Sequence, residues 1–256
     1  MMSEPDDAPR AYAFFRSFQT MEAETRAFPF HYLLYASSGA FTLEVNTAVW
    51  LLPPQRAAWI AANTPITISI RRPVTFCSAL FAPGFIPTPE ADCRVFGMTP
   101  LAREMVQHAV RWERNRENAN ETADRFFLSL ADVCLDLARV PDQFWMPRPQ
   151  SQELRHVLKL ATDDLSVEVN FAHLAEAAHI SERTLARRFD DELGMTWREV
   201  LRRARMIRAM ELLSEPGDKV VDVALATGFS SVSAFNSAFR EFTGETPSHY
   251  RKRIVL

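Results

Sequence analysis

Two segments near the end of the sequence repeat each other. One, LAEAAHISERTLARRFDDELGMTWREV, begins at Leu174, and the other, VALATGFSSVSAFNSAFREFTGETPSHY, begins at Val223. These two residues lie 49 positions apart, whereas the pairs from the first matched serine onward lie 50 apart, so the second copy has one extra residue before its serine. The matched pairs are Ser181 and Ser231, Leu185 and Phe235, Phe189 and Phe239, Gly194 and Gly244, and Thr196 and Thr246. A repeat of this period predicts two copies of one folded unit.

Each copy has the pattern of a helix, a tight turn and a second helix. Ser181 and Ser231 are placed to cap the second helix of each copy, because a serine at a helix start accepts hydrogen bonds from backbone N–H groups. Gly194 and Gly244 are placed to end these helices in the left-handed conformation. The apolar residues four positions apart face inward. The side chains that then point outward are Arg183, Ala186 and Arg187 in the first copy and Ser233, Asn236, Ser237 and Arg240 in the second.

One long helix is predicted between the copies. Thr196 and Glu199 have the spacing of a capping box, and the run ends at residues 214–217. About 18 residues at a rise of ~1.5 Å give a helix of ~27 Å. That length suits two recognition helices held near the ~34 Å repeat of one DNA turn. The helix also carries five arginines, of which we expect some to contact phosphates and others to be solvated: Arg198, Arg202, Arg203, Arg205 and Arg208.

Bulk charge argues in the other direction. Residues 151–256 carry 15 Lys or Arg and 16 Asp or Glu, so this part of the chain has no basic excess. DNA-binding proteins usually have one, since neutralised phosphates supply much of their affinity. Basic residues gather locally, with eight arginines and five acidic residues between Ser181 and Arg208 and three basic residues at 251–253. A helical bundle without DNA contact is therefore the structural alternative.

Earlier in the chain, residues 30–81 read as short strands separated by turns, which predicts a small β-barrel or jelly roll. Helices are predicted at about 101–116 and 122–140. In the second, apolar residues recur at heptad spacing, which fits either packing against the barrel or pairing with the same helix of a second copy. These candidate dimerisation residues are Phe126, Leu130, Val133 and Leu137. The segment 141–149 holds three prolines and predicts a linker.

Other classes of protein are disfavoured. The first residues lack the apolar core of a signal peptide and no run of 18 uncharged apolar residues occurs, so we expect a cytoplasmic protein that binds no membrane. The chain has 3 cysteines without metal-ligand spacing, so neither a disulfide framework nor a metal site is expected. No nucleophile elbow, phosphate-binding loop or carboxylate pair indicates an enzyme, and no cofactor is expected. An isolated residue such as Cys77 is more often a core residue than a nucleophile.

The segment from Phe171 to Arg253 resembles the AraC/XylS family of bacterial transcription regulators. The resemblance rests on ISERTLARRF, on REVLRRARMIRAMELL and on DVALATGFSSVSAFNSAFREFTGETPSHYR. It implies binding to double-stranded promoter DNA through two helix-turn-helix units, frequently as an activator that acts with RNA polymerase. The positions it assigns to DNA bases are Arg183, Ala186 and Arg187 in the first unit and Val232, Ser233, Asn236 and Ser237 in the second. Arg188 and Arg240 are further candidate DNA-binding residues on these helices. For Arg183 and Arg188, phosphate contact or solvation is an equally good interpretation.

The first part of the chain resembles the cupin-type sensor domain of that family, through HYLLYASSGAFTLEVNTAVWLLPPQRAAWIAANTPITISI. The histidines of metal-binding cupins are absent, since Arg26, Phe28 and Ile66 occupy those regions and His31 stands alone. Candidate residues for a small-molecule effector are His31, Phe41, Trp50, Arg56 and Arg71, although core packing or solvation explains each of them as well. A barrel that serves only dimerisation or protein interaction is the alternative.

The expected fold class is therefore α+β, with a cupin-like β-barrel and helices followed by an all-α domain of two helix-turn-helix units joined by a linker helix. The expected division is 1–140 for sensing or dimerisation, 141–150 for the linker and 151–256 for DNA binding. The expected function is sequence-specific transcription regulation by a homodimer, as an activator that is controlled by an effector bound to the N-terminal barrel.

Overall fold

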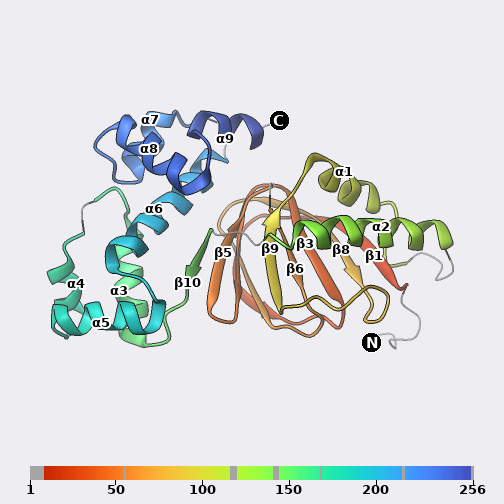
Figure 1. Cartoon of the computed structure of the whole chain (residues 1–256), viewed down its shortest axis with the longest axis horizontal. Coiled ribbons are helices and arrows are strands. Elements are labelled where there is room, and N and C mark those ends of the chain that lie inside the picture. The colour runs from red at the N-terminus through yellow and green to blue at the C-terminus, as the bar shows by residue number, and fades with distance from the viewer. Residues whose placement is uncertain are drawn as a thin grey trace. The chain divides into compact units, whose positions relative to one another are not determined.

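The computed structural model describes residues 9–54, 56–115, 120–140, 144–167, 169–214 and 217–254 (Figure 1). The chain divides into two compact units, one of residues 1–46 and 50–143 and one of residues 47–49 and 144–256. Strands predominate in the first unit and helices in the second, which confirms the α+β class. Of the expected linker, 141–143 lie outside the described residues.

The first unit consists of antiparallel strands in two sheets. One sheet has the order β1-β8-β3-β6-β9 and the other includes the order β5-β4-β7-β2. The strands are β1 (Ala11–Phe18), β2 (Met21–Arg26), β3 (His31–Ser38), β4 (Phe41–Val45), β5 (Ala48–Leu52), β6 (Arg56–Ile60), β7 (Ile66–Ile70), β8 (Val74–Phe81) and β9 (Cys93–Gly97). Because side chains alternate along a strand, β3 sends Leu34 to the core between the sheets and Leu33 to the opposite face.

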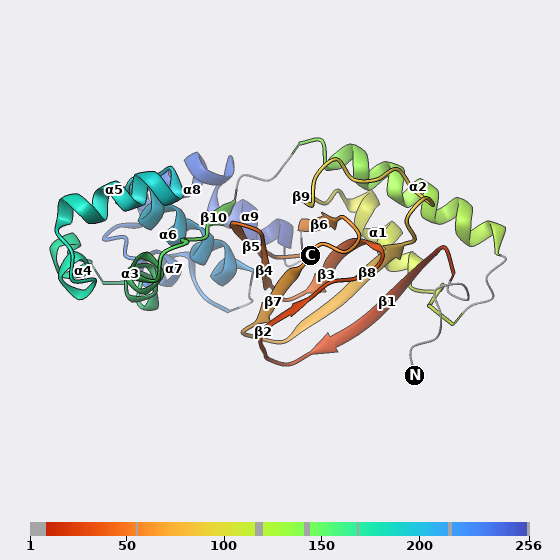
Figure 2. The same cartoon turned by 90° about the horizontal axis from the view of Figure 1, so that it is seen from below.

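That opposite face is covered by two helices, α1 (Pro100–Ala109) and α2 (Glu121–Leu137). Figure 2 shows them along one side of β3, β8 and β1. Val106 of α1 and Phe127 of α2 belong to the same buried cluster as Leu33 of the sheet. The first helix is expected from the sequence to end at about residue 116, but it ends at Ala109. It ends there because the N–H groups of residues 110–112 bond to carbonyls only three residues back.

The second unit contains the short strand β10 (Trp145–Pro147) and seven helices among its described residues. They are α3 (Gln152–Asp163), α4 (Phe171–Ala177), α5 (Glu182–Leu193), α6 (Trp197–Leu213), α7 (Val220–Ala226), α8 (Val232–Thr243) and α9 (Pro247–Ile254). The repeat is confirmed in three dimensions, since α4 and α7 lie 49 positions apart and α5 and α8 lie 50 apart. The linker helix is α6, and Thr196 and Glu199 form its capping box.

The capping residues behave as the sequence predicts. The hydroxyl oxygens of Ser181 and Ser231 accept hydrogen bonds from N–H groups three residues later, at 3.2 Å in both copies. Gly194 and Gly244 end α5 and α8 in the left-handed conformation, with φ of 61° and 82°. Because each cap satisfies backbone groups at a helix end, the same local rules fix both second helices.

The extra residue of the second copy is Ser230. In each copy the apolar turn residue donates a hydrogen bond back to the first helix. Ile180 N–H donates to the Ala175 carbonyl, and Phe229 N–H donates to the Ala224 carbonyl, both at 3.0 Å. These pairs are 49 positions apart in the two copies, so the turns coincide up to Phe229 and differ only after it.

Candidate nucleic-acid interface

The candidate recognition helix of the first copy is α5, whose two faces differ in burial. Leu185, Phe189 and Leu193 are buried in the core that α3 and α4 share with it. Arg183, Ala186 and Arg187, on the other side, are exposed. Arg187 lies 3.9 Å from Asp191, and its side chain remains 72% exposed, so this exposed ion pair is weak. The guanidinium is available to an incoming acceptor.

The candidate recognition helix of the second copy, α8, repeats this division. Phe235 and Phe239 are fully buried, and their rings pack against each other with centroids 5.7 Å apart. The outward positions are all exposed: Val232, Ser233, Asn236, Ser237 and Arg240. Its candidate contacts are therefore mainly short polar groups, whereas those of α5 include two arginines.

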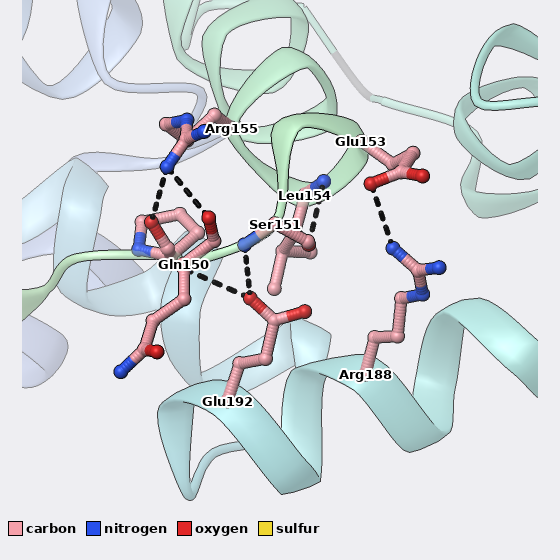
Figure 3. A network of polar contacts seen from close by, with 8 residues as sticks. Gln150, Ser151, Glu153, Leu154, Arg155, Arg188 and Glu192 are labelled. Atoms are coloured by element: carbon pink, nitrogen blue, oxygen red, sulfur yellow. Dashed lines mark hydrogen bonds and ion pairs between the residues drawn. The ribbon is translucent and has the colours of Figure 1, made fainter.

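Arg188 differs from the other residues of the expected interface. Its Nη1 donates to Glu153 Oε2 of α3 at 2.9 Å, and its side chain is 30% exposed (Figure 3). The hydrogen bond and the charge of Arg188 help to lower the pKa of Glu153 below its usual value, after the larger effect of a backbone hydrogen bond. In this arrangement Arg188 ties the recognition helix to α3.

Glu192 makes a second connection between the same helices. Its Oε2 accepts from the backbone N–H groups of Gln150 at 2.9 Å and Ser151 at 2.8 Å (Figure 3). Burial raises the pKa of this carboxyl, and the hydrogen bonds from Ser151 and Gln150 outweigh that effect and lower it. Glu192 is therefore charged at neutral pH and holds the chain at the start of α3.

The arginines of the linker helix α6 are mostly engaged within the unit. Arg202 pairs with Glu241 of α8, and Arg208 pairs with Glu211. The Arg203 guanidinium donates to the Trp145 carbonyl at 2.9 Å, and that of Arg205 donates to the Val167 carbonyl at 3.5 Å. Arg198 is exposed. The expectation that these arginines are either phosphate contacts or simply solvated therefore missed their structural contacts.

The contacts made by residues 144–151 were also not predicted from the sequence. Two aromatic residues, Phe144 and Trp145, stand in a segment that was assigned only as a linker, and aromatic rings seldom remain in water. Ser151 is the N-cap of α3, and its oxygen accepts from Leu154 N–H. The two aromatics and this capping serine were the available signals.

The candidate effector residues do not form one site. By strand alternation His31 shares the face of Leu33, toward the helices, whereas Phe41 lies fully buried between the sheets. Trp50 is partly buried against the core between the sheets. Arg56 is buried at the start of β6, and Arg71 is exposed. These five residues therefore belong to different environments.

His31 itself behaves as a core histidine. Its Nδ1 accepts from Ala62 N–H at 3.1 Å, and its side chain is buried. Burial lowers the pKa of His31, because the charged imidazolium is poorly solvated there. A neutral ring on the helix side of the sheet does not supply a charge for an anionic effector. Among the described residues no group of His, Cys, Asp and Glu has the arrangement of a metal site.

The candidate dimerisation residues pack within their own unit. Leu130 is fully buried in the core that α1 and α2 share with the sheet. Phe126, Val133 and Leu137 are partly buried against the same core, and the Phe126 ring lies 5.0 Å from that of Trp112. Of the two interpretations of this heptad pattern, the placement favours packing against the sheet.

Cys77 lies in the same core, with no exposed surface. Burial raises the pKa of its thiol to about 12, so the sulfur is protonated at neutral pH and is a poor nucleophile. Within the described ranges, no helix has the length and apolar character needed to span a membrane.

Comparison with known proteins agrees with this geometry. The helix-turn-helix domain family matches residues 174–253, which cover both copies of the repeat. The HTH-type transcriptional regulator NimR of Escherichia coli (strain K12) is 28% identical over 228 residues, which are 87% of this chain and 80% of NimR. The HTH-type transcriptional activator RhaR of Pectobacterium carotovorum is 29% identical over 62% of this chain, and the match spans 55% of RhaR.

Solved structures were compared as well. The chain is similar to a DNA-binding transcriptional dual regulator from Escherichia coli K-12, with 27% identity and a TM-score of 0.39. That match covers 41% of this chain and 95% of the solved chain.

Proposed function

Because the C-terminal unit is a helix-turn-helix domain of the AraC family of DNA-binding transcription regulators, we propose that this protein reads promoter DNA with both of its recognition helices. The observation that carries the proposal is the pair of equivalent helices, α5 and α8, each with a buried apolar face and an exposed polar face. The 17 residues of α6 between them correspond to ~26 Å at a rise of ~1.5 Å per residue. Two helices on such a spacer suit successive major grooves, which recur every ~34 Å.

The exposed side chains suggest how bases are read. Arg187 has the two parallel N–H donors that match O6 and N7 of guanine, and Asn236 has the donor and acceptor that match adenine. On α8 the exposed Arg240 stands near the end of the helix, whereas α5 presents Arg183 and Arg187 near its start. We therefore assign the larger share of sequence readout to the first helix-turn-helix unit.

Replacement of one arginine tests this assignment. Arg187→Ala is expected to weaken binding to a selected cognate site by about 1 to 3 kcal/mol, because a bidentate contact to guanine is lost. Fluorescence anisotropy at fixed salt measures the affinity. The matched control is Arg139→Ala. Arg139 is an exposed arginine of the N-terminal unit, and its side chain is 81% exposed. Equal affinities for the parent and Arg187→Ala would remove this residue from the base-reading set.

The proposal also covers the role of the N-terminal unit, which contains the two sheets. A small-molecule effector bound between the sheets needs space there, but Phe41, Leu34 and Leu43 are fully buried in that core. This packing favours the second candidate, a unit that serves dimerisation or protein interaction. A dimer is expected in sedimentation, with twice the 29.2 kDa mass of the chain. A monomer that binds its complete site with full affinity would contradict dimerisation as the role of this unit.

We further propose that the protein acts in the cytoplasm as an activator that works with RNA polymerase, in keeping with RhaR, a relative named as an activator. Transcription from a promoter that carries the selected site should rise when the protein is supplied. A fall in transcription would assign repression instead.

A further inference from the structure

The two helix-turn-helix units have separate hydrophobic cores. The first is built from α3, α4, α5 and the start of α6, where Val200 is fully buried. The second is built from the later part of α6, where Met206 is fully buried, together with α7, α8 and α9. Since neither cluster contains buried residues of the other, the orientation of one unit relative to the other depends on α6 and on whatever else bridges them.

One bridge is the segment of residues 144–151, called here the entry strap, which precedes α3. At its beginning the Phe144 ring packs on that of Phe242, near the end of α8, with centroids 5.0 Å apart. Arg203, near the middle of α6, donates to the Trp145 carbonyl, and its guanidinium lies 5.6 Å from the Trp145 ring and 5.8 Å from the Phe242 ring. The beginning of the strap is thus fixed to the second recognition helix and the linker helix.

The end of the entry strap is fixed to the first recognition helix. Met146 packs against the first core, and Glu192 of α5 accepts from the backbone N–H groups of Gln150 and Ser151 (Figure 3). Pro147 and Pro149 are buried between these contacts, and their rings restrict the backbone of the strap. A short and stiff segment therefore contacts both recognition helices.

The two anchor positions are equivalent in the repeat. Glu192 and Phe242 are 50 positions apart, and each is the last residue but one of its recognition helix. The entry strap thus holds the same point of both helices, through hydrogen bonds in one copy and through an aromatic contact in the other.

We propose that the entry strap is a brace that sets the distance and angle between the two recognition helices, with Glu192, Phe242 and Arg203 as its positioning residues. Its consequence for DNA rests on the proposed function, because only a protein that reads two grooves needs this spacing. The brace itself is a property of the free protein.

Distance measurement in the free, full-length protein tests the brace. Spin labels are attached to a ketone-bearing amino acid at positions 183 and 233, equivalent exposed positions of α5 and α8, so that the native cysteines stay unlabelled. Pulsed electron resonance should give one narrow distance distribution for the parent. Phe144→Ala and Glu192→Ala should each broaden and shift it. Unchanged distributions in both folded variants would overturn the proposal.

Two further variants separate bracing from general destabilisation. Glu192→Gln keeps a side-chain oxygen that can accept from Gln150 and Ser151, so the narrow distribution should return. Phe171→Ala makes the same change as Phe144→Ala, but among the described residues Phe171 packs on the first core, against Phe189 and Trp197. A distribution as broad in Phe171→Ala as in Phe144→Ala would contradict a specific role for the strap.

A second measurement uses DNA. The parent should bind its selected site more tightly than the same site with one base pair inserted between the two half-sites. In Phe144→Ala and Glu192→Ala the ratio of these affinities should fall toward one, and an unchanged ratio would contradict the brace. If the protein does not bind DNA specifically, the proposed function fails, whereas the distance measurement still decides on the brace.

Discussion

Gly228→Val is expected to destabilise the C-terminal, helical unit strongly. Gly228 has a φ of +75°, where a residue with a side chain costs about 1 to 2 kcal/mol. A Cβ at this position would also lie 2.4 Å from the Leu165 carbonyl oxygen and 2.6 Å from Nη2 of Arg205. With about 1 to 3 kcal/mol for the forced shift of that backbone, the total is about 2 to 5 kcal/mol. Chemical denaturation of the full chain measures it.

The first copy supplies a control of opposite sign. His179 is the equivalent of Gly228, 49 positions earlier, and it holds the same left-handed conformation with a φ of 56°. His179→Gly should therefore raise the free energy of unfolding by about 0.5 to 1 kcal/mol, because the relief of strain exceeds the entropy that glycine adds to the unfolded chain. If Gly228→Val left stability unchanged, or if His179→Gly lowered it, the assignment of these turns would be wrong.

Simultaneous replacement of Arg187 and Asn236 by alanine is expected to cause the largest loss of DNA affinity. Each bidentate contact contributes about 1 to 3 kcal/mol of discrimination, so the double variant should lose about 2 to 6 kcal/mol on the cognate site. The two residues lie on different helices with separate cores, so their effects should add within about 0.5 kcal/mol. Anisotropy titrations of the parent, both single variants and the double variant measure this.

The double variant also tests whether both helix-turn-helix units contact DNA bases. A loss no larger than that of Arg187→Ala would mean that Asn236 reads no base. Binding to unrelated DNA should be weak in the parent and change little, because residues 151–256 have no basic excess and non-specific binding depends on phosphate contacts.

Much of the second unit could be predicted because its signals are local. Ser181, Ser231, Gly194 and Gly244 act through hydrogen bonds and backbone angles within one turn of their own positions. The capping box of α6 is equally local, and the repeat doubled the evidence for each feature. The exposed faces of α5 and α8 followed from the same periodicity.

Contacts between distant residues could not be predicted in this way. Arg188 has the same local pattern as Arg187, but its ion pair with Glu153, 35 positions away, depends on how α3 packs. In the first unit, the heptad pattern that includes Leu130 fits a helix on a sheet as well as a dimer, since both bury one apolar stripe. The structure places Leu130 against the sheet of its own unit.

The candidate effector residues show a further limit. Phe41 and His31 are both buried, but the faces they occupy are decided by strand register, which composition does not reveal. Aromatic residues in a β-rich segment therefore predict buried surface without deciding between a ligand pocket and a packed core. The placement of His31 and Phe41 on opposite sides of the sheet that contains β3 means that these two residues do not line one pocket.

Reading of adjacent major grooves by two helix-turn-helix units is tested most directly by chemical footprinting. Duplexes are first selected from a random pool with the full-length protein, and guanine N7 protection is then mapped on the enriched site. We expect, per chain, two protected clusters whose centres lie about 10 base pairs apart on one face of the DNA, with Arg187→Ala removing protection from one of them. A selection that enriches no sequence, or a footprint confined to a single groove per chain, would contradict this reading of DNA.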